Sequence, residues 1–152
     1  MEAERQAEEK KRKEEMEAKK KAEEAKKNPP GWAEAEVKKN LGNAEYKKKN
    51  LDKAVEFYSE AIALCPGEII YHSNLGAAYI EMKEYDKCIE ECDKAIEKTK
   101  ESAYDYVKLA KVYARKASAL SHKGDLDASI DVYKKALLEN NDYWIKDSMK
   151  KV

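Results

Sequence analysis

The segment NLGNAEYKKKNLDKAVEFYSEAIALCP, residues 40–66, decides the fold because its pattern recurs along the chain. A Leu-Gly pair at 41–42 is followed by small and aromatic residues at helical spacing, and Leu-Gly returns 34 residues later at 75–76. A third copy follows the Gly-Asp pair at 124–125. Self-similarity at this period is typical of stacked helix pairs, because one pair cannot bury its apolar face alone.

Each copy is predicted to form two amphipathic helices joined by a short turn. The turn of the third copy lies 41 residues after that of the second, so seven residues have been added within 101–123. Seven residues make about two helical turns, which lengthen a helix and keep its buried face in place. Residues 142–151 carry Trp144, Ile145 and Met149, and we expect them to form a capping helix. The helix pairs are expected at 35–48 and 51–64, 69–82 and 85–98, and 102–122 and 126–138.

The composition favours helices and argues against several classes of function. Charged residues make up 41% of the 152 residues, with only 5 Gly and 3 Pro, which favours long helices over a sheet with many turns. The formal net charge is zero, whereas a general nucleic-acid binder is strongly basic. No apolar run is long enough to cross a bilayer. We therefore expect no nucleic-acid partner and no membrane segment. Three cysteines without a secretory leader favour reduced thiols in the cytoplasm.

Residues 1–31 are predicted to form a charged extension ahead of a repeat domain at 32–152. Opposite charges lie four residues apart, as in Glu9 with Lys13, and each such pair adds roughly 0.2–0.5 kcal/mol to a helix. The absence of an apolar seam argues against a coiled coil and leaves a solvated helix or a partly frayed linker. Oligomeric state stays open, with a monomer as the expectation. The sequence NPPG at 28–31 ends the helix, since proline disfavours helix at the residue before it.

The repeated pattern resembles the tetratricopeptide repeat over residues 35 to about 140. The residues that carry the resemblance in the first copy are Leu41, Gly42, Ala54, Tyr58, Ala61 and Pro66. Departures are mild, because Cys88 and Ser129 stand where the family has a small Ala, and Ala117 stands where it has Gly. The resemblance implies an all-α fold of three helix-turn-helix repeats in a right-handed superhelix, over 35–68, 69–102 and 103–141, with the cap after them.

Three stretches resemble a narrower family, the Hop heat-shock organising co-chaperones, and within it the middle tetratricopeptide module. They are KNLGN at 39–43, YDKC at 85–88 and DYVKLAKVYAR at 105–115. The resemblance implies a non-catalytic adaptor without a cofactor. In this family the groove holds the acidic Glu-Glu-Val-Asp tail of a chaperone, and the middle module prefers heat-shock protein 90 to heat-shock protein 70. Heat-shock protein 70 is therefore the alternative partner.

Five polar residues are expected to converge on the concave surface. In the repeat frame they fall at helix positions three or four apart, which share one face of the first helix of each pair. Lysine, arginine and asparagine supply hydrogen-bond donors, and no carboxylate stands among them. A chain that ends in Asp presents two carboxylates, and charge-assisted hydrogen bonds hold such groups most strongly. The five residues are Lys39, Asn43, Asn74, Lys111 and Arg115.

The resemblance assigns these five positions to a carboxylate clamp, with no substitution in this chain. Tyr46 and Lys108 continue the same helix stripes, so we expect them to contact the upstream part of a bound peptide. Glu81 is a further expected contact, as an acceptor for a peptide N–H group. A scaffold that uses the convex face or the N-terminal helix is the rival hypothesis. A targeting module from a longer enzyme, such as a phosphatase or a prolyl isomerase, is the third.

Other candidate sites are weaker. Cys88 and Cys92 lie four residues apart and could bridge a metal, but the repeat requires small buried side chains there, so we expect core packing and no metal site. His72 and His122 are isolated in the sequence and are expected at the surface. No glycine-rich phosphate loop and no convincing Ser-His-Asp or Cys-His set is present, so we expect no enzyme activity.

Overall fold

The computed structural model describes residues 1–100 and 104–152, without the side chains of 23–27, and the described part contains helices and no strand. The all-α expectation is confirmed. The helices are α1 (Glu2–Lys27), α2 (Trp32–Lys47), α3 (Leu51–Leu64), α4 (Ile70–Glu81), α5 (Tyr85–Lys98), α6 (Tyr106–Lys123), α7 (Leu126–Glu139) and α8 (Tyr143–Lys150). The expected start of the sixth helix at residue 102 lies outside the described residues, as does the expected boundary between the second and third repeats.

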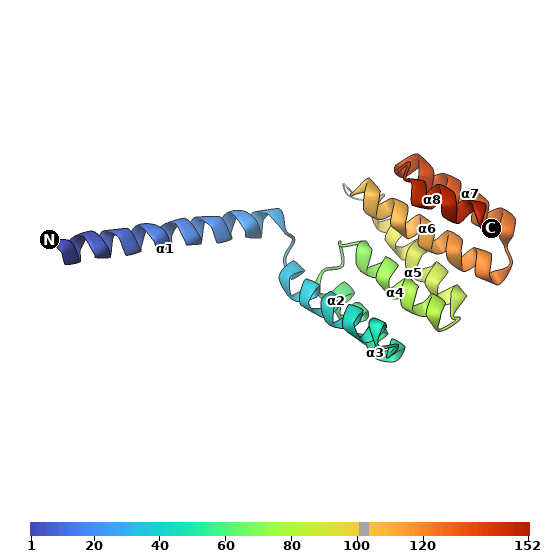
Figure 1. The fold of residues 1–152 in the computed structure, drawn as a ribbon, viewed down its shortest axis with the longest axis horizontal. Coiled ribbons are helices and arrows are strands. Elements are labelled where there is room, and N and C mark those ends of the chain that lie inside the picture. Colours follow the sequence, from blue (N-terminus) through green and yellow to red (C-terminus); the bar gives the residue numbers. More distant parts are fainter. Residues whose placement is uncertain (101–103) are drawn as a thin grey trace.

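The three helix pairs stack in sequence order (Figure 1). Helix α2 packs on α3, α4 on α5 and α6 on α7, while α3 contacts α4 and α5 contacts α6 to join the pairs. The first helices of the second and third pairs, α4 and α6, also contact each other directly. This arrangement brings the first helices of successive pairs to one side of the stack, where their polar residues meet.

The three turns within the pairs share one geometry. A residue just behind each first helix, the second after α2 and α4 and the first after α6, adopts a left-handed conformation, with φ of 66° at Lys49, 62° at Lys83 and 92° at Gly124. The next backbone N–H then donates to a carbonyl five residues earlier, from residue 50 to 45, 84 to 79 and 125 to 120, at 2.8–3.0 Å. This bond is the helix-ending arrangement that a left-handed residue permits.

Small residues let the paired helices approach closely. A Cβ atom added at Gly42 would lie 2.7 Å from the Tyr58 ring, and one at Gly76 would lie 3.0 Å from Cys88 Sγ. The first distance is shorter than Cβ atoms normally show, so an alanine at 42 would displace the Tyr58 ring, and the second leaves a Cβ atom at 76 in a tight contact. Cys88 and Cys92 are fully buried in the core, and the expectation of core packing for them is confirmed. In the third pair the Ser129 hydroxyl donates to the Ala117 carbonyl at 2.7 Å.

His72 contradicts the surface expectation, because only 2% of it is exposed. Its Nδ1 lies 2.9 Å from Glu91 Oε2, and its Nε2 lies 2.9 Å from the Lys98 ammonium nitrogen. The reason is the position of α4 in the middle of the stack, where it packs against α3, α5 and α6 and buries polar as well as apolar residues. His122, by contrast, is exposed as expected.

The two ends of the repeat stack differ. Helix α1 projects away from the bundle (Figure 1), and its side chains over residues 1–22 are exposed, with Lys13 Nζ 3.7 Å from Glu9 Oε1. It is therefore a solvated helix rather than a frayed linker. At the other end α8 packs on α7. Ile145 is fully buried there and Met149 is partly buried beside it, so the expectation of a capping helix is confirmed. No helix in the described ranges is both long and apolar enough to span a membrane.

Candidate functional site

The five predicted polar residues line one cavity of about 560 Å³, which we call the polar groove. Lys39 and Asn43 come from α2, Asn74 from α4, and Lys111 and Arg115 from α6. Lys39 lies four residues before Asn43 on α2, and Lys111 lies four residues before Arg115 on α6, so the two residues of each pair point to the same side. The full lining comprises Lys39, Asn43, Ile70, Ser73, Asn74, Lys111, Ala114, Arg115, Ser118, Tyr133, Trp144 and Ser148.

The charged side chains that line the polar groove are all positive. Three of its lining side chains are cationic and none is acidic, although the chain as a whole is neutral. Lys111 and Arg115 have no ion-pair partner within 4.0 Å among the residues that the structure describes, whereas nearby lysines such as Lys108 and Lys116 are paired. Arg115 Nε is buried and has no hydrogen-bond partner in the described chain. A buried donor without a partner is costly, so this atom favours an acceptor supplied from outside.

Tyr58 fixes the orientation of Asn43. The Tyr58 hydroxyl donates to Asn43 Oδ1 at 2.6 Å, from a ring that is buried in the core behind α2. Burial raises the pKa of Tyr58 to about 12, so the hydroxyl keeps its proton at neutral pH and remains a donor. With its oxygen engaged in this way, Asn43 presents its amide N–H groups as donors for the groove.

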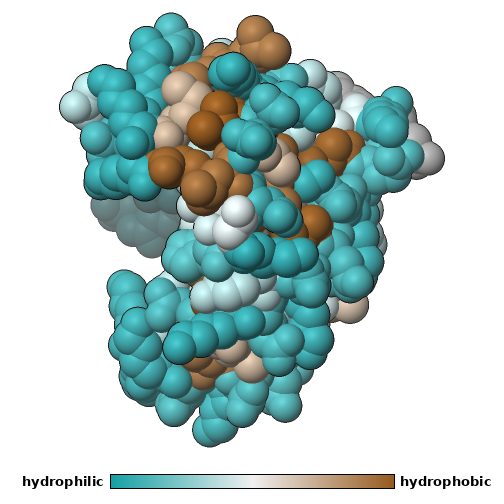
Figure 2. All heavy atoms as spheres, turned by 90° about the vertical axis from the view of Figure 1, so that its right-hand side faces the viewer, coloured by the Kyte–Doolittle hydropathy of each residue, from teal (hydrophilic) through white to brown (hydrophobic). Residues whose placement is uncertain are grey.

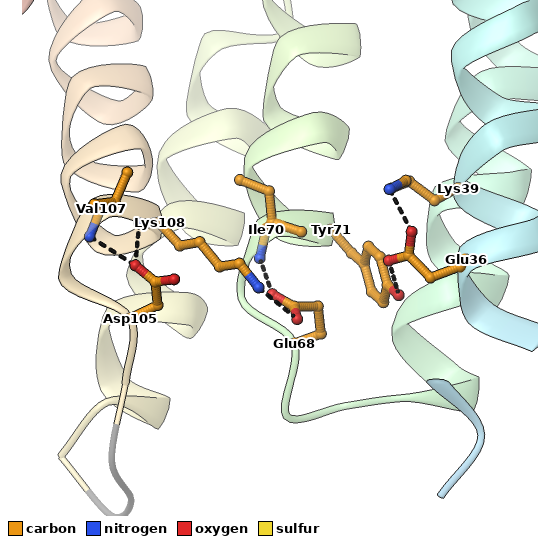
Figure 3. A network of polar contacts seen from close by, with 8 residues as sticks. All are labelled: Glu36, Lys39, Glu68, Ile70, Tyr71, Asp105, Val107 and Lys108. Carbon is orange, nitrogen blue, oxygen red and sulfur yellow. Dashed lines mark hydrogen bonds and ion pairs between the residues drawn. The ribbon is translucent and has the colours of Figure 1, made fainter. Parts of the chain in front are cut away.

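Lys39 is held by an acidic residue of its own helix (Figure 3). Its ammonium group donates to Glu36 Oε2, and the other carboxylate oxygen of Glu36 accepts the Tyr71 hydroxyl at 2.8 Å. Burial raises the pKa of Glu36, but the hydrogen bonds from Lys39 and Tyr71 outweigh it, and the net pKa is lowered. Glu36 is therefore ionised at neutral pH. Tyr71 is fully buried, which fixes this network between α2 and α4.

The capping helix also contributes to the polar groove. Trp144 and Ser148 from α8 line it together with Tyr133 from α7, and the Ser148 hydroxyl donates to the Trp144 carbonyl at 2.8 Å. Figure 2 views the molecule from the side of these helices and shows most hydrophobic residues of that face in its upper half, with a smaller group near the lower edge. Sequence reasoning used Trp144 only as a capping residue and missed its place at the groove.

The three peripheral residues do not line the polar groove. Tyr46 packs against the core around Tyr58, and Glu81 Oε2 lies 3.5 Å from the Lys49 ammonium nitrogen. Lys108 pairs with Glu68 at 2.9 Å (Figure 3). Contacts between these three residues and a bound peptide stay predictions. Among the described residues no group of three or more His, Cys, Asp or Glu side chains has the arrangement of a metal site.

Two family models match the repeat region. One, described as "TPR repeat", matches residues 42–83, and the other, described as "Tetratricopeptide repeat", matches residues 67–137. Among curated proteins, the Hsp70-Hsp90 organizing protein of Triticum aestivum is 41% identical over 112 residues, covering 71% of this chain and 19% of that protein. The Hsp70-Hsp90 organising protein of Plasmodium falciparum is 36% identical over 123 residues, covering 81% of this chain and 22% of that protein. The chain thus spans about a fifth of the length of these relatives.

Solved structures of related domains have the same fold. The N-terminal domain of stress-induced protein-1 from C. elegans is 32% identical, with a TM-score of 0.70, and the match covers 82% of this chain and 98% of that domain. The TPR2AB-domain:pHSP90 complex of yeast Sti1 is 33% identical with a TM-score of 0.74, covering 78% of this chain and 46% of that one. The TPR2B-domain:pHsp70 complex of yeast Sti1 is 25% identical with a TM-score of 0.67, and the match covers 77% of this chain and 94% of that one.

Proposed function

We propose that this chain, which belongs to the tetratricopeptide repeat family, is a co-chaperone adaptor module that binds the acidic C-terminal tail of a heat-shock chaperone in its polar groove. The observation that carries the proposal is that Lys111 and Arg115 have no ion-pair partner among the described residues, in a groove whose described lining holds no acidic side chain. The buried, unpartnered Arg115 Nε adds a specific donor for an incoming oxygen atom.

The chemistry of the polar groove fits a chain that ends in Asp. Such an end carries a main-chain and a side-chain carboxylate close together, and the polar groove offers cations from two helices, α2 and α6. Each charge-assisted hydrogen bond contributes roughly 1.5–3 kcal/mol, compared with about 1 kcal/mol for a neutral one. Asn43 and Asn74 are suited to bond the peptide backbone and so fix the direction of the tail.

Heat-shock protein 90 is the proposed first partner and heat-shock protein 70 is the alternative. Support comes from the similarity to yeast Sti1 domains whose complexes are with pHSP90 and pHsp70, and from the resemblance of residues 39–43 and 105–115 to the middle Hop module. We further propose that the module is cytoplasmic, in keeping with its three free cysteines, and that it acts by binding without catalysing a reaction.

Affinity is expected on the order of micromolar, because a short flexible peptide loses much conformational entropy on binding. Binding should weaken as salt is added, since charge pairing in a hydrated groove is screened with a Debye length of about 8 Å at physiological ionic strength. A groove that recognised only apolar side chains would show little dependence on salt. The salt dependence therefore separates charge recognition from apolar recognition.

Calorimetric titration with the peptides Met-Glu-Glu-Val-Asp and Ile-Glu-Glu-Val-Asp, each with a free or an amidated C-terminus, tests the proposal. We expect the Met peptide to bind more tightly, and amidation to weaken binding at least about tenfold, the effect of losing one charge-assisted interaction. Tighter binding of the Ile peptide would assign the module to heat-shock protein 70. If neither free-acid peptide binds, the adaptor proposal is refuted and the scaffold hypothesis takes its place.

A further inference from the structure

The cations of the polar groove differ in how far they are neutralised within the chain. Lys111 and Arg115 have no acidic partner in the described residues, but the Lys39 ammonium group donates to the Glu36 carboxylate. Glu36 itself is outside the groove lining and lies three residues before Lys39 on α2. An acidic ligand that enters the groove therefore meets one lysine that already has a carboxylate bound to it.

We propose that Glu36 is an internal competitor of the acidic tail, whose carboxylate occupies Lys39 in the empty groove and lowers the affinity of the groove for the tail. This inference rests on the proposed function, because it concerns the same groove and the same class of ligand. It makes Glu36 a residue that sets affinity, whereas the five clamp residues provide the binding contacts.

The Glu36 carboxylate cannot simply turn away when a tail arrives. Its second oxygen accepts the hydroxyl of Tyr71 at 2.8 Å, and Tyr71 is fully buried in α4 (Figure 3). Its side chain is only 22% exposed, as is that of Lys39 at 23%. The negative charge of Glu36 thus stays beside the groove, where it both neutralises Lys39 and repels the carboxylates of a bound tail.

A neutral replacement isolates the effect of that charge. The substitution Glu36→Gln keeps a carbonyl oxygen that can accept a hydrogen bond, and it removes the negative charge with little change in shape. An acidic tail with several carboxylates should then bind roughly 3- to 10-fold more tightly, since one like charge is lost and Lys39 is freed. Glu36→Ala is less informative, because it leaves the Tyr71 hydroxyl without its acceptor and risks the fold.

Helix α2 also provides a matched control. Lys38, next to Lys39 in the sequence, pairs with Glu60 of α3 at 2.9 Å, and neither residue lines the polar groove. The variant Glu60→Gln therefore makes the same change in net charge at an ion pair on the same helix, away from the groove. Any gain that comes only from the total charge of the chain will be equal in the two variants.

The experiment titrates the wild-type chain, Glu36→Gln and Glu60→Gln with the free-acid peptide Met-Glu-Glu-Val-Asp, and repeats Glu36→Gln in a Lys39→Ala background. We expect a gain of roughly 3- to 10-fold for Glu36→Gln and a change below about twofold for Glu60→Gln. In the Lys39→Ala background the gain from Glu36→Gln should be smaller, because the repulsion is still relieved but no lysine is freed. Circular dichroism melts of each variant confirm that folded chains are compared.

The outcomes separate this inference from the proposed function. Wild-type binding together with equal or weaker binding by Glu36→Gln would overturn the inference and leave the adaptor function in place. An equal gain in Glu60→Gln would also overturn it, because the effect would then come from total charge. No binding by the wild-type chain would overturn both. A second readout uses no peptide: acylation of lysines, read by mass spectrometry, should label Lys39 several-fold faster in Glu36→Gln than in wild type, and unchanged labelling contradicts the pairing.

Discussion

Tyr58→Phe is the most informative single substitution behind the polar groove. It removes the hydroxyl that donates to Asn43 Oδ1 at 2.6 Å and leaves the buried ring in place, so no cavity forms. A hydrogen bond of this kind contributes about 1 kcal/mol net, with a range of roughly 0.5–1.5. The free energy of unfolding should fall by about that amount, because the Asn43 oxygen is only partly buried and water can replace its partner.

The same substitution should weaken peptide binding. Without its partner the Asn43 amide is free to turn, and the donors that it presents to the groove are no longer fixed. Loss of about one neutral hydrogen bond corresponds to roughly a fivefold loss of affinity. Urea denaturation gives the stability change, and calorimetric titration with the free-acid Met-Glu-Glu-Val-Asp peptide gives the affinity change.

Tyr113→Phe is the control for this test. Tyr113 is also partly buried against the core, but its hydroxyl makes no hydrogen bond with a described residue, so both measurements should stay close to wild type. If Tyr58→Phe lowers stability but binds the peptide as tightly as wild type, then Tyr58 does not orient Asn43 for binding. If neither quantity changes, the hydrogen bond itself is unimportant.

Three further substitutions test the packing and the buried charges. Gly42→Ala places a Cβ atom 2.7 Å from the Tyr58 ring. The cost of overpacking, roughly 1–3 kcal/mol, should exceed the helix-propensity gain of about 1 kcal/mol and lower the midpoint of urea denaturation. An unchanged or higher midpoint would contradict the close approach. Ile145→Ala empties a fully buried site in α8 and should lower the unfolding free energy by about 2–5 kcal/mol, unless α8 contributes little to the fold. The hydrogen bond from His72, opposed by burial, lowers the pKa of Glu91 below its ordinary 4.5. The stability that this gives is present above about pH 4.5 and is lost as pH falls through the lowered pKa, so the advantage of wild type over Glu91→Gln should shrink in melts from pH 7 to pH 3, and a constant advantage would argue against the assignment.

Much of the fold could be predicted because the same pattern of small and apolar residues recurs in each repeat. The bounds of α3 and α5 match the expected 51–64 and 85–98, since small residues at fixed offsets mark the second helix of each pair. The start of α6 was harder to place. It begins after Asp105, whose Oδ1 accepts the backbone N–H groups of Val107 and Lys108 at 2.9 and 3.3 Å. Asp is a preferred helix-capping residue, so a signal for this boundary was present in the sequence.

The burial of His72 could not be read in the same way. His72 was expected at the surface because it is isolated in the sequence, and the first copy, which holds the partly exposed Lys38 at this repeat position, gives no sign of burial either. What buries His72 is its place in the middle repeat, under the side chains of Glu91 and Lys98 from α5. Helix α4 also packs against α3 and α6, whereas α2 of the first repeat packs mainly on α3, so the repeats are alike in pattern but differ in burial.

The candidate site was predictable where one helix stripe carries it. The repeat frame brings Lys39, Asn43 and Arg115 to one face, and the structure places them in one groove. The frame does not reveal which side chains act on these residues from another element. Tyr58 was recognised only as a residue of the repeat pattern, and Glu36 was one of 31 acidic residues with nothing in the sequence to distinguish it. Both depend on contacts between helices that only the folded chain displays.

The most direct test of the central claim is a double-mutant cycle between Lys111 and the terminal carboxylate of the peptide. The wild-type chain and Lys111→Ala are each titrated with free-acid and amidated Met-Glu-Glu-Val-Asp. The control variant is Lys116→Ala, because the Lys116 ammonium nitrogen lies 2.6 Å from Asp93 Oδ1, outside the groove. If Lys111 holds that carboxylate, Lys111→Ala and amidation should each weaken binding at least about tenfold. The two changes together should weaken it far less than the product of the two single losses, which corresponds to a coupling free energy of at least about 1 kcal/mol. Losses that multiply, or a Lys111→Ala variant that binds like wild type, would contradict a carboxylate clamp.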